Sequence, residues 1–80
     1  MKYYLKNEHI IVGTKFQEQD ILFYGEEKND RLRLKIIAAR AKGGKWTKPK
    51  ERTASREATA THLYKPTTKE TALAIILAAK

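Results

Sequence analysis

The pattern that most limits the fold lies at residues 31–36, where charged and aliphatic side chains alternate. The six residues are Arg31, Leu32, Arg33, Leu34, Lys35 and Ile36. Successive side chains of a β-strand point to opposite faces of the sheet, so this pattern predicts a strand with one basic face and one apolar face. A chain that contains such a strand is expected to build a sheet that buries one of its faces.

Residues 37–39 interrupt this alternation. The next cations, Arg40 and Lys42, have even numbers, so in an unbroken strand they would point to the face opposite the first three cations. One extra residue within 36–38, a β-bulge, would restore the register and return all these cations to one face. The alternative is a helix, which Asp30 could cap and Gly43 could end. At about 100° per residue the cations would then lie on two opposite sides, which is a poor amphipathic pattern. We therefore favour a strand over residues 31–42.

Basic residues are concentrated in the middle third of the chain. Residues 31–56 carry ten Lys or Arg and one acid, whereas residues 1–30 have a net charge of −2 and residues 57–80 a net charge of +1. Like charges that are held together repel one another and cost folding free energy, so this concentration points to an anionic partner. The alternative is a soluble protein with a hydrated basic loop.

The 80 residues contain no cysteine, which makes the fold depend on its core alone or on oligomerisation. Disulfides and thiolate zinc sites are excluded, and His9 and His62 alone do not make a common structural zinc site. Ser55, His62 and Glu57 are not placed as a catalytic triad, because adjacent strand residues point to opposite faces. We expect one domain over 1–80, with no enzymatic activity, no metal and no cofactor.

Short apolar or alternating segments predict several strands. The expected strands are residues 3–5, 10–12, 21–24, 31–42 and 56–64. The polar residues 6–8 would form a hairpin turn, and residues 25–30 have the Gly, Asn and Asp composition of a second turn. Residues 43–55 contain two glycines, a proline and several cations, and we expect a flexible basic loop there.

A C-terminal helix is the clearest expectation. Pro66 would end the preceding strand, and Thr67 and Glu70 have the spacing of a capping box. Residues 71–79 are apolar almost all round, so the helix is either well buried or binds a partner on its second face, as in a homodimer through helix 67–79. The chain is thus predicted to be α+β: a small antiparallel sheet of three to five strands with one C-terminal helix packed on one face. The other face would be free and would carry the cations.

The candidate binding residues are the cations of the middle segment and the single tryptophan. They are Arg31, Arg33, Lys35, Arg40, Lys42, Lys45, Trp46, Lys48, Lys50, Arg52 and Arg56. Lys and Arg neutralise phosphates and release counterions. Arginines on a sheet can contact base edges in a major groove, while loop cations contact the backbone and position the protein. Trp46 could stack on an unpaired base, or it could be a core residue.

These features predict a non-enzymatic nucleic-acid-binding module. DNA is slightly favoured over RNA, because RNA-binding sheets usually display aromatic side chains and the exposed-face candidates here are Arg and Lys. The tyrosines are expected in core or cross-strand packing; they are Tyr3, Tyr4, Tyr24 and Tyr64.

The alternative function is that of a small inhibitor or adaptor, of mobile-element or phage type. Such a protein would dock its basic surface on an acidic site of a host protein or nucleoprotein machine. No apolar run reaches the ~20 residues that cross a bilayer, and no signal-peptide pattern is present. We therefore expect a cytoplasmic protein with no membrane partner.

Overall fold

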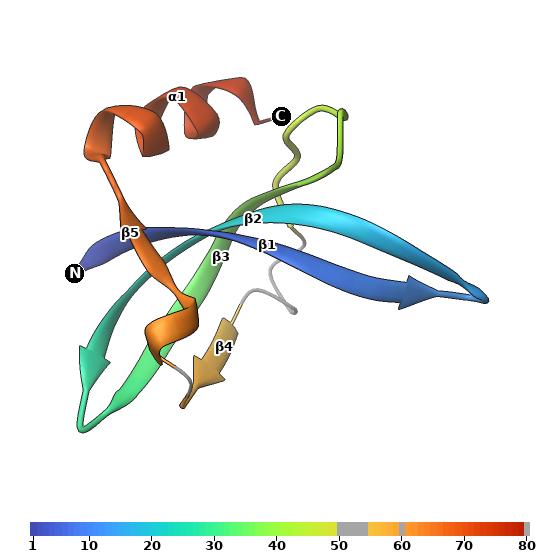
Figure 1. Ribbon diagram of the computed structural model, residues 1–80. Coiled ribbons are helices and arrows are strands. Elements are labelled where there is room, and N and C mark those ends of the chain that lie inside the picture. Colours follow the sequence, from blue (N-terminus) through green and yellow to red (C-terminus); the bar gives the residue numbers. More distant parts are fainter. Residues whose placement is uncertain (50–54, 60, 80) are drawn as a thin grey trace.

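The computed structural model describes residues 1–49, 55–59 and 61–79. These residues form a five-stranded antiparallel sheet and one C-terminal helix (Figure 1), which confirms the α+β class. The elements are β1 (Lys2–Val12), β2 (Lys15–Lys28), β3 (Arg31–Ala41), β4 (Ser55–Ala58), the 3-10 turn η2 (Thr61–Leu63), β5 (Lys65–Thr67) and α1 (Lys69–Ala78). Across the sheet the strands follow the order β4-β3-β2-β1-β5.

β1 is a single long strand, and the hairpin turn expected at residues 6–8 is wrong. The chain instead reverses at Gly13 and Thr14, where Gly13 has a φ of 66° that suits glycine in a two-residue hairpin turn. Residues 6–8 remain in the strand because each polar side chain has a partner there. Asn7 donates a hydrogen bond to Asp20 on β2 at 2.9 Å, and Glu8 accepts one from Arg56 on the other face.

β2 and β3 are joined by a two-residue turn at Asn29 and Asp30. Their φ angles are 51° and 61°, the combination that type I′ hairpin turns require at both central positions. The turn predicted for residues 25–30 is therefore confined to its last two residues, and the strand continues to Lys28.

The predicted β-bulge is present in β3, and the helix alternative for residues 31–42 is wrong. Leu22 of β2 lies opposite Ala38, and the next residue of β2 lies opposite Ile36, so Ile37 is the extra residue. The bulge returns Arg40 to the face that carries the cations at the start of the strand.

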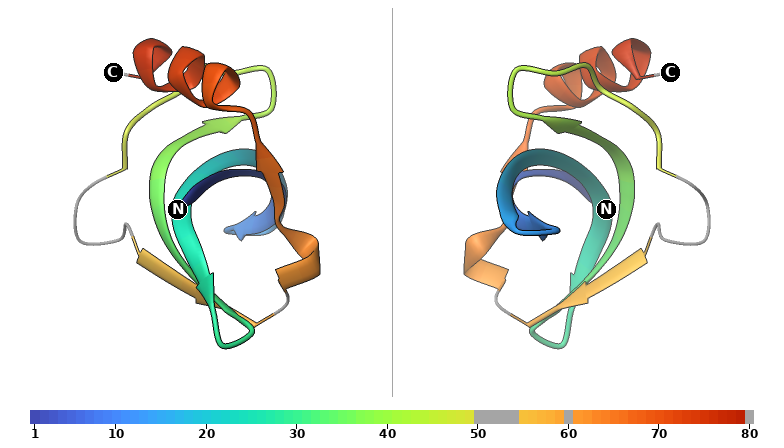
Figure 2. Two further views of the ribbon diagram at one scale, coloured as in Figure 1. Left: turned by 90° about the vertical axis from the view of Figure 1, so that its left-hand side faces the viewer. Right: turned by 90° about the vertical axis from the view of Figure 1, so that its right-hand side faces the viewer.

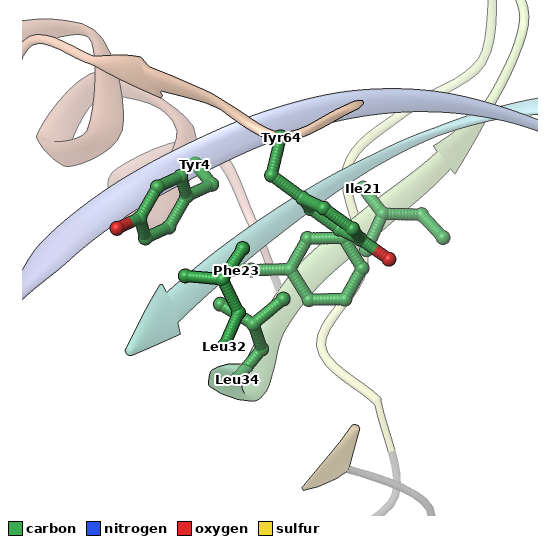
Figure 3. Close-up of a cluster of buried hydrophobic side chains, with 6 residues drawn as sticks. All are labelled: Tyr4, Ile21, Phe23, Leu32, Leu34 and Tyr64. Atoms are coloured by element: carbon green, nitrogen blue, oxygen red, sulfur yellow. The ribbon is translucent and has the colours of Figure 1, made fainter. Parts of the chain in front are cut away.

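The sheet has an apolar cluster on each side. On its concave side the buried residues are Tyr4, Ile21, Phe23, Leu32, Leu34 and Tyr64 (Figure 3). On the helix side they are Leu22, Ala38, Ala72, Ile75 and Ala79. Residues 21–23 of the central strand β2 supply both clusters in alternation. This explains why that segment is a continuous apolar run: both of its faces are buried.

The expectation of a free basic face is wrong, because α1 packs on part of the face that carries the cations. The bulge places Ala38 beside Leu22 on that face, and α1 docks there through Ala72 and Ile75. The concave face is also covered, since Tyr64 packs edge-on against Phe23 with ring centroids 5.5 Å apart. Figure 2 shows the sheet curled around this concave side with α1 on the outside of the curve.

The single strand predicted over residues 56–64 is wrong: β4 and the 3-10 turn η2 lie there, and β5 begins after it. Pro66 lies within β5 rather than ending a strand, and it is tolerated because β5 is an edge strand that pairs only with β1. The cap of α1 falls one residue later than expected. Thr68 is the N-cap, and its hydroxyl accepts a hydrogen bond from the backbone N–H of Thr71 at 3.2 Å.

Gly25 is required by the close approach of β2 to β3. A Cβ atom at this position would lie 1.9 Å from the carbonyl oxygen of Arg33, which is backbone and cannot move aside. We predict that Gly25→Ala lowers the free energy of unfolding by about 3 kcal/mol, as overpacking does. Urea unfolding followed by the fluorescence of Trp46 measures this loss. Gly44→Ala is the comparison: its Cβ would lie 3.1 Å from the carbonyl oxygen of Ala41, a tight contact that a shift of a few tenths of an ångström relieves, so we expect a smaller loss. Equal losses for both variants would contradict the argument.

Candidate nucleic-acid interface

The cations of β3 lie in one row that α1 divides into two groups. Ala38 lies beneath the helix with none of its surface exposed. The proximal group, on the side of the β2–β3 turn, consists of Arg31, Arg33 and Lys35. The distal group, beyond Ala38, consists of Arg40 and Lys42.

Acids of β2 neutralise the distal group. Arg40 Nε lies 3.0 Å from an oxygen of Asp20, and Lys42 Nζ lies 3.3 Å from one of Glu18. A hydrogen bond from Asn7, together with that from Arg40, outweighs burial and lowers the pKa of Asp20, which keeps this carboxylate charged. Two acids from the first half of the chain, Glu18 and Asp20, therefore lie directly beside these cations.

Trp46 packs beside the helix rather than standing free on a loop. Thr47 pairs with Ala39 through two backbone hydrogen bonds of 2.9 and 3.0 Å, which hold this segment against the end of β3. The indole is half-buried against the cluster on the helix side, and the guanidinium of Arg40 lies 4.7 Å from its ring centroid. Trp46 also lines a hollow of about 470 Å³ with Lys45 and Ala78.

The segment that follows β3 presents two further cations. Lys45 and Lys48 are exposed. Lys50 and Arg52, which the sequence also marks as candidates, lie outside the described residues. So do the other residues of 50–54, which belong to the flexible loop predicted at 43–55. Their role in binding stays a prediction.

The proximal group is exposed on the uncovered part of the face. Arg31 Nη1 lies 3.1 Å from a carboxylate oxygen of Glu57 on β4, in a pair that is itself exposed. Arg33 lies between Glu26 on one neighbouring strand and Glu57 on the other. The cross-strand neighbours of Lys35, by contrast, are uncharged (Tyr24 and Ser55).

Arg56 differs from the other candidates because it lies on the concave side. One of its nitrogens lies 2.6 and 2.7 Å from the two carboxylate oxygens of Glu8, and 3.4 Å from the Tyr64 hydroxyl. Burial alone would raise the pKa of Glu8, but hydrogen bonds from Arg56 and Lys6 lower it below its ordinary value. The guanidinium also lies over the ring of Phe23, 5.0 Å from its centroid. Arg56 therefore ties β4 to β1 across the concave core.

Tyr3 and Tyr24 form cross-strand packing of the kind that the sequence predicts, and this pair lies on the cation face. Tyr3 and Tyr24 are directly opposite each other on β1 and β2, with ring centroids 4.6 Å apart, and both are half-buried. Tyr4 and Tyr64 lie in the concave core as expected, and burial, followed by the charge of Glu27, raises the pKa of Tyr4. Adjacent residues of a strand point to opposite faces, so the sequence alone could have shown that Tyr3 and Tyr4 do not lie on the same face.

Comparison with known proteins finds no family model, no curated protein and no solved structure that matches this chain. Among the residues that the structure describes, no three His, Asp or Glu side chains gather as a metal site would need. The described part of the chain also contains no helix with the length and apolarity needed to span a membrane.

The ion pair between Glu8 and Arg56 predicts a pH-dependent stability. The pKa of Glu8 in the folded protein lies below its ordinary value of 4.5, so the stabilisation is complete above that pH and is lost as pH falls through the folded value. We predict that Glu8→Gln lowers the free energy of unfolding at pH 7 by about 1–2 kcal/mol, because the pair is partly screened by solvent.

Urea unfolding across pH 3–7 measures this effect, and the difference between Glu8→Gln and the unchanged protein should shrink as the pH falls. Glu27→Gln, which alters an exposed carboxylate, is the control. A Glu8→Gln deficit that is the same at every pH would rule out the ion pair as its cause.

Proposed function

We propose that this protein is a non-enzymatic module that binds nucleic acid through the proximal group of cations on β3. The observation that carries the proposal is the position of Arg31, Arg33 and Lys35 on alternate residues of a strand, exposed and clear of the helix. Arg33 and Lys35 also line a hollow of about 430 Å³. Cations spaced along one strand suit the repeated negative charge of a phosphate backbone.

The ion pairs favour a smaller set of contacts than the sequence suggested. The distal group already has carboxylates within ion-pair distance, and Arg56 is held by Glu8 on the concave side. A cation with such a partner gains less from a phosphate, because the existing ion pair must first be broken. Arg31 is likewise paired with Glu57. We therefore assign the main contacts to Arg33 and Lys35, which form no ion pair with any described residue, and take Lys45 and Lys48 as further backbone contacts.

The test compares two double variants with the same change in net charge. We predict that Arg33→Ala/Lys35→Ala weakens the binding of a labelled oligonucleotide about tenfold and flattens the salt dependence of log K by roughly 1.5, as the loss of two phosphate contacts would. Lys15→Ala/Lys42→Ala removes two exposed cations away from the proposed site, and it should leave affinity nearly unchanged. Fluorescence anisotropy at several salt concentrations measures both, and equal losses would show that only net charge matters.

An acidic protein surface would attract the same cations, and the same titration separates the two partners. A protein–protein contact of a few ion pairs depends less steeply on salt than a nucleic-acid contact does. Absence of nucleic-acid binding at physiological salt would contradict the proposal and favour the inhibitor or adaptor function.

We also propose that the protein forms a homodimer through the outer face of α1. Leu77 is 85 % exposed and Leu73 is 43 % exposed one helical turn before it, and alanines occupy the other exposed positions from residue 72 to residue 78. An uncharged stripe suits a two-fold contact with a second copy, because no like charges meet. An antiparallel pairing would also bring Glu70 at one end of α1 towards Lys45, which lies beside the other end in the partner.

Sedimentation equilibrium tests this contact. We predict that Leu77→Lys converts a dimer into a folded monomer, because the side chain is exposed and its loss leaves the core intact. Leu63→Lys changes another exposed leucine, on η2, and should leave the dimer unchanged. A monomer at all concentrations of the unchanged protein would contradict the proposal.

A further inference from the structure

A row of side chains crosses all five strands on the cation face and has two tyrosines at its centre. The register places Ser55, Lys35, Tyr24, Tyr3 and Thr67 opposite one another on β4, β3, β2, β1 and β5. Directly opposed residues of a sheet share one face. This row lies beside the cluster that α1 covers, and Tyr3 packs against that cluster.

The two rings form one aromatic surface. Their centroids are 4.6 Å apart and their planes are tilted by 43°. Both tyrosines remain partly exposed, whereas Tyr4 and Tyr64 in the concave core keep 5 % and 9 % of their surface. Tyr3 packs against the cluster on the helix side, and the pair still lines a hollow at the surface.

Cation-lined hollows adjoin the tyrosine pair on both sides. On the β3 side, Arg33 and Lys35 line the hollow of about 430 Å³ that also contains Tyr24. On the β5 side, Lys2 and Lys69 line a hollow of about 530 Å³ that contains both tyrosines. Each hollow has the volume of a small-molecule site. The row thus combines flat aromatic surface with positive charge on both sides.

We infer that Tyr3 and Tyr24 form a stacking platform for unpaired bases, so that the ligand is a single-stranded nucleic acid. This inference rests on the proposed function and names its substrate class. Bases stack on aromatic side chains through faces that a duplex keeps covered, while cations beside the platform hold the phosphates. The arrangement revises the preference for duplex DNA, which assumed that the cation face carried no aromatic side chains.

The first experiment separates stacking from phosphate binding. Labelled oligothymidylate is compared with an abasic DNA of the same number of phosphates, and oligouridylate with its abasic counterpart separates RNA from DNA. A base-bearing strand of either kind should bind about tenfold more tightly than its abasic counterpart. Equal affinity for both, with binding still sensitive to Arg33→Ala/Lys35→Ala, would overturn the platform and leave the proposed function standing. No binding to any strand would overturn both.

Variants then locate the platform. Tyr3→Leu/Tyr24→Leu keeps apolar bulk but removes the rings, and it should abolish the preference for base-bearing strands, whereas Tyr3→Phe/Tyr24→Phe should retain it. Phe16→Leu is the matched control, since Phe16 is 75 % exposed at the far end of the β1–β2 hairpin and its loss should have no effect. In the unchanged protein, the NMR ring signals of Tyr3 and Tyr24 should shift on binding while those of the buried Tyr64 do not. Unshifted Tyr3 and Tyr24 signals in a saturated complex would overturn the platform even if the leucine variant does not fold.

Discussion

The burial of β2 on both of its faces is the constraint on which the rest of the structure depends. Residues 21–23 of this strand are at most 5 % exposed, and they send side chains alternately into the concave cluster and into the cluster under α1. Helix α1 covers one of these two faces, and the curled sheet together with Tyr64 encloses the other. The bulge at Ile37 makes the arrangement possible, because it moves Ala38 to the side of Leu22, where a small residue lets the helix approach closely.

The same bulge decides what the positive charge of the chain can do. It keeps the cations of β3 on one face. It also places Ala38 between them, beside Leu22, and α1 packs on this apolar site. The distal cations, exemplified by Arg40, then lie next to carboxylates of β2, while the proximal cations stay exposed beside Tyr24. The value of each cation for binding therefore depends on whether it already forms an ion pair with a carboxylate, rather than on the net charge of the segment.

Much of the fold could be predicted from local patterns, and the errors share a physical cause. The alternation at residues 31–36, its slip near Ile37 and the apolar C-terminal segment correctly indicated a bulged strand and a helix. The predicted turn at residues 6–8 was wrong because Glu8 and Asn7 find partners on Arg56 and Asp20, which are distant in the sequence. A polar residue in a strand resembles a turn residue until its partner is known.

For the candidate site, the sequence by itself determined the residue types: a cluster of cations, alternating on a strand, with tyrosines nearby. It could not determine which face the helix would cover, because both faces of the sheet have apolar positions and the choice depends on shape at Ala38. Nor could it show that Lys35, Tyr24 and Tyr3 share one row. That row exists only through the pairing of strands that are far apart in the chain, and strand register is a property of the tertiary structure.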